Sequence, residues 1–140
     1  MPPNNMPTTI FKSTIPWDMP VFEHGVEVLV DKHARAARSF ANRHKRRLYL
    51  ERITDHSDHQ SAIRVIGKSK GWFFEKSKCI GYVQANIAEK LISATIEDKV
   101  KVRLHMISTD EMRSIEIRFD IFGSKNDYEK YCVNQIRQNN

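Results

Sequence analysis

The sequence has no apolar run near the roughly 20 residues that a membrane-spanning helix needs. Its first residues, MPPNNMPTT, lack the basic start and apolar stretch of a secretory signal peptide. We therefore expect a cytoplasmic protein with no membrane partner. The two cysteines, Cys79 and Cys132, fit that compartment as free thiols, although a single disulfide between them stays open.

Phosphate-binding glycine motifs are also missing. The five glycines are scattered singly, and none belongs to a G-x-x-x-x-G-K-[ST] loop, which excludes an ATPase built on this chain alone. Neither cysteine has a C-x-x-C partner, so the sequence has no zinc knuckle and no dithiol redox motif. We expect no cofactor and no enzymatic activity.

Proline does not occur after residue 20, and all five prolines lie within the first 20 residues. We expect residues 1–22 to form a Pro-rich N-terminal arm and residues 23–137 to form a single domain, which suits a chain of 140 residues. The arm is too apolar for a simple linker, so its later half should pack on the domain or on a second subunit. Its large apolar residues are Ile10, Phe11, Ile15, Trp17, Val21 and Phe22.

Positive charge is concentrated in one segment. Between Lys32 and Arg47 there is no acidic residue, and removing the seven Lys and Arg charges of this segment from the net +6 leaves −1. Such a concentration is expected of a protein that binds a polyanion, or else of a solvated helix face that carries excess arginine. The seven residues are Lys32, Arg35, Arg38, Arg43, Lys45, Arg46 and Arg47.

Hydrophobic spacing predicts several elements in the first half of the chain. Alternation predicts a strand from Val26 to Val30, and helical spacing around Phe40 predicts a helix over residues 32–46, capped by Asp31. The segments RLYLERI, SAIRVIG and CIGYV read as strands. Gly67 and Gly71 are expected in the turn of a hairpin, with at least one of the adjoining aromatic residues facing outward: Trp72, Phe73 and Phe74.

The second half predicts a helix, two long strands and a last helix. Asn86, with Glu89 as the return half of a capping box, should start a helix that reaches Ala94. In the strands over 100–106 and 115–121, alternate residues face the core, while Arg103, His105 and Asp120 are among those that face outward and can pair across the strands. Ser124 can cap the last helix. Six short strands without regular strand–helix alternation predict a mainly β (α+β) fold, a small barrel with two to three flanking helices.

The loop Thr54-Asp55-His56-Ser57-Asp58-His59-Gln60 carries metal-ligand side chains. His56, Asp58 and His59 are candidate ligands of a metal-dependent hydrolase, yet a loop does not fix three donors as a helical H-E-x-x-H motif does. The alternative is a polar connection whose aspartates cap backbone N–H groups. That alternative is preferred, so no metal is expected.

Several segments together resemble the HIRAN domain family, over roughly residues 24–135. Arg52 matches the family's arginine at a strand end, and the loop 54–60 occupies the place of its acidic loop. Ala62-Ile63-Arg64-Val65 matches an Ala-Ile-x-Val strand, and Ile80-Gly81-Tyr82-Val83 matches a glycine turn that leads into a helix. The resemblance is most specific between Leu50 and Leu91.

The resemblance implies an OB-like barrel that binds the 3′ end of single-stranded DNA, in DNA repair or replication-fork processing. In the family, a loop aspartate contacts the terminal sugar hydroxyl and tyrosines stack on bases. Here the family's Tyr-Asp pair falls on Asp58-His59, whereas Tyr82 keeps the family's His/Tyr position. The concentration of positive charge and the resemblance together give the candidate nucleic-acid-binding residues. The basic segment supplies Arg43, Lys45, Arg46 and Arg47, and the resemblance supplies Arg52, His56, Asp58, His59 and Tyr82.

Three functions therefore follow from the sequence. The first is a non-enzymatic nucleic-acid-binding module. The second is a protein-interaction or scaffold module, in which the apolar arm contacts a protein partner or a second copy of the chain. The third is a metal-dependent hydrolase at His56, Asp58 and His59.

Overall fold

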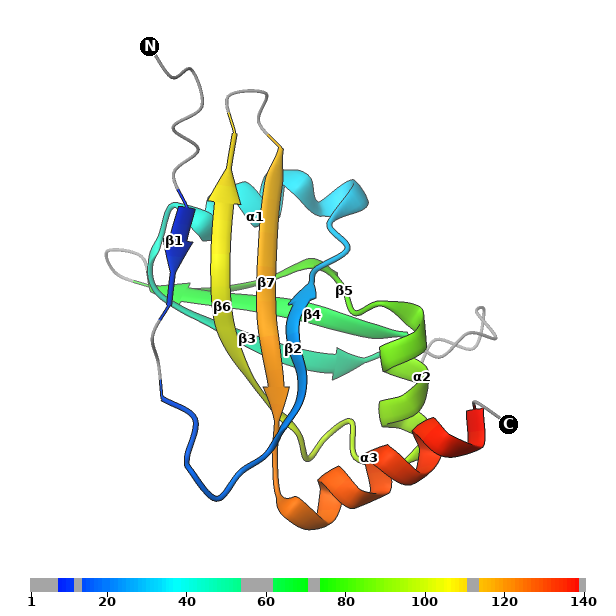
Figure 1. Cartoon of the computed structure of the whole chain (residues 1–140). Helices are drawn as coiled ribbons and strands as arrows, with labels where there is room; N and C mark the ends of the chain where they lie inside the picture. The colour runs from blue at the N-terminus through cyan, green and yellow to red at the C-terminus, as the bar shows by residue number, and fades with distance from the viewer. Residues whose placement is uncertain (1–7, 12–13, 54–61, 71–73, 111–113, 139–140) are drawn as a thin grey trace.

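The computed structural model describes residues 8–11, 14–53, 62–70, 74–110 and 114–138, with side chains described up to residue 133. The described residues form two antiparallel sheets and three α-helices, so the mainly β prediction is confirmed. The two sheets cross steeply (Figure 1). Within the described residues, no helix is long and apolar enough to cross a membrane.

The first sheet has the strand order β1-β6-β7-β2. The alternation over 100–106 and 115–121 folds as predicted into two of its strands. Ile117, Phe119 and Ile121 of the second of these have no solvent-exposed surface. The four strands are β1 (Thr8–Ile10), β2 (Val21–Glu27), β6 (Lys101–Thr109) and β7 (Ile115–Phe122).

The second sheet has the order β3-β4-β5, and its strands are β3 (His44–Arg52), β4 (Ile63–Lys70) and β5 (Glu75–Tyr82). Gly67 was predicted to lie in a turn, but it lies inside β4, where a Cβ atom would come within 2.8 Å of Cδ1 of Phe40. The pairing of β4 with β5 extends to Lys70 and Glu75, and residues 71–73, which include the other predicted turn residue, Gly71, lie outside the described residues. Phe74 beside them is 77% exposed, which confirms that one of the three aromatic residues faces outward.

The predicted helix over 32–46 is much shorter in the structure. A 3-10 turn, η1 (Asp31–His33), leads into α1 (Ala34–Ala41), and Asp31 forms no side-chain cap. Ala37 and Phe40 give α1 its buried face, as expected. The helix stops because the next residues pair with β4, and tertiary pairing overrides their helix propensity. The cations after Arg43 therefore lie on a strand and not on the last helical turns.

The other two helices lie at one end of the first sheet (Figure 1). α2 (Ala85–Ser93) has the predicted extent, but Gln84 precedes it and no side chain caps it, so the predicted capping box of Asn86 and Glu89 is wrong. α3 (Lys125–Gln138) begins as predicted, because Asp127 N–H donates to Oγ of Ser124 over 3.1 Å.

The two sheets meet along two seams of different character. On one side, the chain leaves β2 and Leu29 exchanges two backbone hydrogen bonds with Tyr82 of β5. On the other side, β3 and β6 lie side by side, but no described strand pairing joins them. The described strands therefore do not form the closed six-stranded barrel that was expected.

Part of the N-terminal arm packs on the domain. β1 pairs with β6, and Phe11 N–H donates to the backbone oxygen of His105. Phe11 is half-buried against the core, whereas Trp17 is 96% exposed. Val21 and Phe22 belong to β2, and Phe22 packs on Tyr131 of α3 with ring centroids 5.5 Å apart.

Asp120 was expected to face solvent, but its side chain is fully buried. The cross-strand pairing predicted for this face is confirmed, because Arg103 stands opposite Asp120 and its Nη2 lies 2.6 Å from Oδ2. The other oxygen, Oδ1, accepts the Gly25 N–H at 2.8 Å and lies 2.8 Å from Nδ1 of His24. A carboxylate with these partners satisfies its charge without water.

Burial alone would raise the pKa of Asp120, but the Gly25 N–H, Arg103 and the nearby His24 together hold this pKa below its usual value. Asp120 is therefore ionised in the folded protein. A carboxyl with a depressed folded-state pKa stabilises the fold at every pH above its unfolded pKa, about 3.9. That contribution is lost as the pH falls through the lower folded value.

We predict that Asp120→Asn lowers the free energy of unfolding by about 3 kcal/mol at pH 7, because Arg103 loses its buried counter-charge. The difference from the parent should shrink below about pH 4, where this carboxyl becomes protonated in the unfolded chain, and should disappear below the lower folded-state pKa. Urea denaturation of both proteins at pH 7 and at a pH below 4 measures this difference in the free energy of unfolding. Glu116→Gln on the same strand removes a half-exposed ion pair with Arg118 and should cost less than about 1 kcal/mol. Equal losses in the two variants would contradict the role given to Asp120.

A second prediction concerns the seam at Gly81. A Cβ atom there would lie 2.5 Å from the backbone oxygen of Leu29 and 2.6 Å from Cγ1 of Val28. Gly81→Ala should therefore push the two sheets apart and lower the free energy of unfolding by about 1–3 kcal/mol, as overpacking does. Ser77→Ala, at an exposed position of the same strand, is the control. Unchanged urea midpoints in both variants would show that the seam tolerates separation.

Candidate functional site

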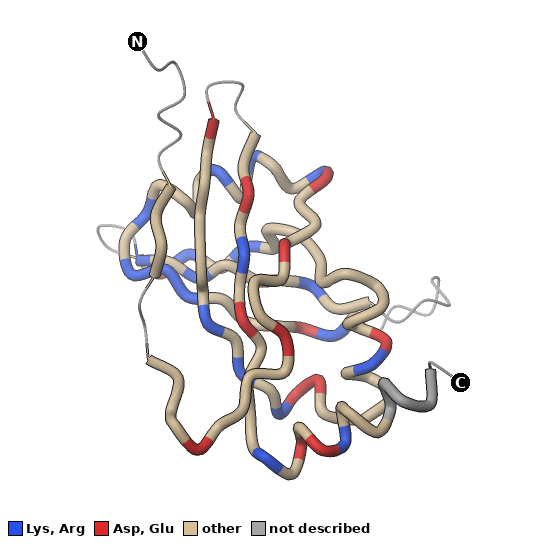
Figure 2. Tube along the Cα trace, in the orientation of Figure 1, with Lys and Arg blue, Asp and Glu red and all other residues tan. Residues whose placement is uncertain are grey.

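Cations from two distant parts of the sequence meet at one end of the second sheet. The antiparallel register places His44 opposite Lys70 and Arg47 opposite Lys68. In the next pair, Lys68 stands opposite Ser77 and Lys70 opposite Glu75. The start of β3 and the β4–β5 hairpin therefore lie together, and Figure 2 shows lysine and arginine gathered where α1 leads into β3. We call eight residues the basic patch: Arg43, Lys45, Arg46, Arg47, Lys68, Lys70, Lys76 and Lys78.

The basic patch contains little compensating negative charge. In the described part of these segments, the only carboxylate is Glu75, which lies 3.3 Å from Nζ of Lys68. Both partners are exposed, and an exposed ion pair of this kind contributes little. Arg43, Lys76 and Lys78 also line one small hollow between α1 and the hairpin. Such clustering creates a positive potential that attracts polyanions.

The backbone at the start of β3 is irregular, and this irregularity affects how Lys45, Arg46 and Arg47 are oriented. Lys45 has a φ of 50°, which is unusual for a residue with a side chain, and the register shifts between His44 and Arg47. Arg46 and Arg47 are consecutive on the strand, so alternation places Arg46 on the opposite face from Arg47. The Arg46 guanidinium donates to the backbone oxygen of Ala41 and lies 4.9 Å from the ring centroid of Phe11. Arg46 is therefore held in place, while Lys45 and Arg47 are exposed.

Two exposed aromatic rings accompany the cations. Phe74 adjoins the hairpin lysines, and Tyr49 is 44% exposed on β3, two residues beyond Arg47. Nζ of Lys68 lies 5.8 Å from the Tyr49 ring centroid. Residues two apart on a strand share a face, so Arg47 and Tyr49 face the same side. The outer face of β3 and β4 thus presents an aromatic ring beside cationic groups.

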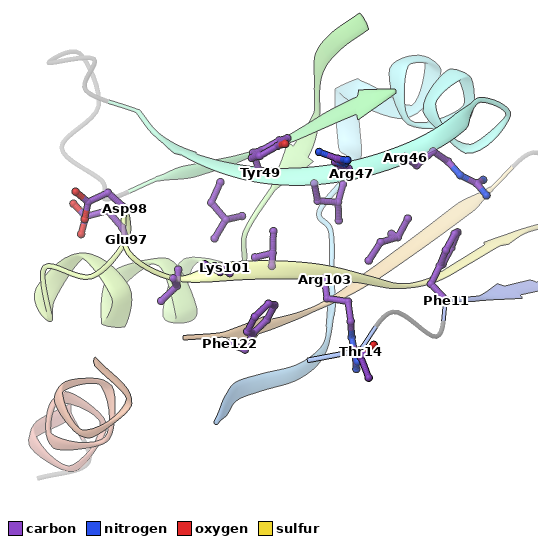
Figure 3. A pocket seen from close by; sticks show the side chains of 15 residues that line it. Phe11, Thr14, Arg46, Arg47, Tyr49, Glu97, Asp98, Lys101, Arg103 and Phe122 are labelled. Carbon is purple, nitrogen blue, oxygen red and sulfur yellow. The ribbon is translucent and has the colours of Figure 1, made fainter. Parts of the chain in front are cut away.

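The open seam between β3 and β6 forms a groove with a volume of about 930 Å³. Its lining includes the apolar side chains of Leu48, Leu50, Val102 and Leu104. Figure 3 shows that Phe11 and Arg46 lie at one end of the groove and Glu97 and Asp98 at the other. The basic end of the groove adjoins the basic patch through Arg46.

The predicted site residues separate into two groups. Arg43, Lys45, Arg46 and Arg47 belong to the basic patch. Arg52 stands at the opposite end of β3, where its Nη1 lies 3.1 Å from Oε1 of Glu97. At about 3.3 Å for each residue, the two ends of β3 lie roughly 25 Å apart, and Arg47 lies about 17 Å from Arg52 along the strand. The loop residues His56, Asp58 and His59 lie outside the described residues.

Tyr82 belongs to the end of the sheet where Arg52 lies. It stands opposite Arg64 of β4, and the next residue, Val83, donates its N–H to the backbone oxygen of Ile63. The Tyr82 ring packs edge-on against His33 with centroids 5.3 Å apart, and its hydroxyl lies 3.4 Å from Nε2 of His33. The segment 80–83 is therefore next to β4, the strand that follows the loop in the sequence.

Both cysteines are free thiols, as expected. Sγ of Cys79 lies 3.9 Å from Nε2 of His33, but it lies closer, at 3.4 Å, to the backbone oxygen of Gly81. A thiol whose S–H points at a carbonyl oxygen is not poised to give its proton to the imidazole. This Cys–His pair therefore lacks the arrangement of a catalytic nucleophile and base.

Sequence reasoning missed the four hairpin lysines and Tyr49 as parts of a binding surface. The signal in the sequence was the motif KSK, which occurs on each side of GWFFE. These lysines can be recognised as part of a binding surface only once β3 is known to pair with β4. Sequence reasoning placed His105 and Asp120 on strand faces that can pair, but it missed His24, which comes from a third strand.

No family model, no curated protein and no solved structure matches this chain.

The basic patch predicts polyanion binding in which the hairpin takes part. Lys70→Ala, Lys76→Ala and Lys78→Ala combined should lower the salt concentration that elutes the protein from immobilised heparin, because three phosphate- or sulfate-binding charges are removed. The matched control removes three equally exposed lysines elsewhere: Lys99, Lys125 and Lys130. Equal shifts in both triple variants would mean that only net charge matters and that the patch is no site.

Proposed function

We propose that the protein is a non-enzymatic module that binds single-stranded nucleic acid, with single-stranded DNA favoured. The observation that carries the proposal is the basic patch with its two exposed rings, Phe74 and Tyr49. Single strands expose both phosphates and base faces, and they are bound by cationic grooves with aromatic side chains on which bases stack. A duplex hides its base faces, so exposed rings beside cations suit a single strand better.

The path of the strand follows from the arrangement of these groups. Arg47 and Lys68 bind phosphates on the face of the sheet that carries Tyr49, and Arg43, Lys76 and Lys78 bind phosphates on the α1 side, where they line one hollow. Bases stack on Tyr49 and on Phe74, which adjoins the hairpin lysines. Each stacked base contributes about 1–3 kcal/mol, and the cations add a salt-dependent contribution.

We further propose that the two sheets are an OB-like barrel that is open along one seam. The strand orders β3-β4-β5 and β2-β7-β6, linked by the bridge between Leu29 and Tyr82, support this proposal. Partly open OB-type barrels bind oligonucleotides on a strand face. The resemblance of Leu50 to Leu91 to the HIRAN family points the same way, toward a cytoplasmic role in DNA repair or replication-fork processing.

The direct test changes Arg43, Lys45, Arg46 and Arg47 to alanine together. Binding of a short single-stranded DNA should weaken, because fewer phosphates are neutralised. The slope of log K against log salt should become shallower, by up to about 0.7 for each phosphate that the variant no longer neutralises. Fluorescence anisotropy at two salt concentrations measures both quantities.

The matched control for the quadruple variant changes three exposed lysines outside the basic patch to alanine together: Lys99, Lys125 and Lys130. Its binding should stay close to that of the parent. If the quadruple variant binds single strands as tightly as the parent at low salt, the segment is a solvated face and the proposal fails.

Recognition of a 3′ end is a finer proposal that rests on the resemblance. It assigns the terminal sugar hydroxyl to Asp58, with His56, His59 and Tyr82 beside it. Asp58→Ala should then weaken binding of a strand with a free 3′-hydroxyl more than binding of a 3′-blocked strand, by about 1–3 kcal/mol for a charged acceptor. Equal affinity of the parent protein for both strands would reject end recognition and leave general strand binding.

A protein-interaction module is the alternative function, and Trp17 is the observation that favours it. This residue is almost fully exposed, and Ile10 of the same arm is 61% exposed. Exposed large apolar side chains mark contact surfaces for protein partners or a second copy of the chain. Apolar association changes little with salt, so a salt-insensitive complex that Trp17→Ala abolishes would favour this alternative.

A further inference from the structure

A cluster of two histidines and one aspartate lies on the first sheet, apart from the basic patch. His24 comes from β2, His105 from β6 and Asp120 from β7. One ligand atom of each lies within 4.8 Å of the others, and the two imidazole rings meet edge to face with centroids 4.8 Å apart. These are the donors of a two-histidine, one-carboxylate metal site.

The partners of Asp120 already account for its charge without the second histidine. Arg103 holds Oδ2 through two hydrogen bonds, of 2.6 and 3.0 Å, and the Gly25 N–H holds Oδ1. A neutralising role therefore explains Arg103 but leaves His105 unexplained. Nδ1 of His105 is buried, has no hydrogen-bond partner and lies 3.7 Å from Oδ2 of Asp120. A buried imidazole nitrogen without a partner is costly unless a ligand completes it.

We propose that His24, His105 and Asp120 bind a divalent first-row transition ion, such as Zn²⁺. His24 Nδ1 and Asp120 Oδ1 are 2.8 Å apart, close to the separation of about 3.3 Å between two donors on a tetrahedral zinc. The His24 side chain is 65% exposed, so it can rotate to open this distance, and water has access to the remaining coordination position.

The groups that surround Asp120 suit this assignment. Ligating carboxylates are themselves held by hydrogen bonds, and Arg103 fixes Oδ2 while Oδ1 stays directed at His24. The positive charge of Arg103 repels any bound cation. An ion that these donors coordinate only weakly therefore does not gain enough binding free energy to overcome the repulsion. Imidazole nitrogens favour zinc, copper, nickel or iron over magnesium or calcium, which prefer oxygen donors. The site therefore selects a transition ion through its nitrogen donors.

The test measures zinc binding by untagged protein that has been stripped with a chelator, in competition with a chromophoric chelator. The parent should bind one Zn²⁺ per chain and melt at a higher temperature when zinc is added. His24→Ala and His105→Ala should each lose more affinity than the roughly 10–100-fold that removal of an outer partner costs. His24 is exposed, so its variant keeps the fold whatever the effect of changing His105. His44→Ala, at an exposed position of β3, is the control and should bind as the parent does.

Two results overturn the proposal. One is a parent protein that binds no more zinc than His24→Ala does. The other is zinc binding that survives in His24→Ala and His105→Ala but disappears when His56 and His59 are changed to alanine, which would move the metal to the loop 54–60. Neither result depends on nucleic acid, so the nucleic-acid proposal is tested separately.

Discussion

The antiparallel register of β3, β4 and β5 is the constraint on which the proposed binding surface depends. It brings Lys68 to Arg47 and Lys70 to His44, although these residues are more than twenty positions apart in sequence. Because strand side chains alternate, a slip of one residue would turn Arg47 and Tyr49 toward the core and Leu48 toward solvent. Burial of Leu48 against the core therefore fixes which cations face outward.

The contrast between the two seams explains how a small chain keeps one sheet surface open. At Leu29 and Tyr82 the sheets are joined by backbone hydrogen bonds, and only a glycine at position 81 allows so close an approach. At β3 and β6 the strands lie side by side without pairing, and the groove stays between them. The first sheet is stabilised by a different interaction, the ion pair of the buried Asp120 carboxylate with Arg103. Rigidity on one side and an open edge on the other suit a binding module.

Much of the fold could be predicted from alternation and helical spacing. The strands around Leu104 and Phe119 and the helix through Leu91 follow from local patterns alone, since each buries one regular face. The helix end near Arg43 could not be predicted, because pairing with a strand some twenty residues away decides it. Asp120 was misplaced for a similar reason: its side chain is covered by His24 and Arg103, which come from two other strands.

The candidate site was predicted only in part. Charge concentration identified Arg43 to Arg47 but not the hairpin lysines, whose relation to them exists only in three dimensions. Arg52 and Tyr82, which the family resemblance implies, were expected to bind the same nucleic acid as these cations, whereas the structure puts them at the other end of the sheet. Either the two groups bind different parts of one nucleic-acid strand, or only one of the groups binds nucleic acid.

The central claim is that single-stranded nucleic acid lies on the basic patch and its exposed rings. The most direct measurement is a nuclear magnetic resonance titration of isotope-labelled protein with a short single-stranded DNA. The account predicts that backbone amide shifts concentrate in residues 43–49 and 68–78, including Tyr49 and Phe74, and diminish as salt is added. Shifts confined to the arm around Trp17, or to the opposite end of β3 near Arg52, would contradict it.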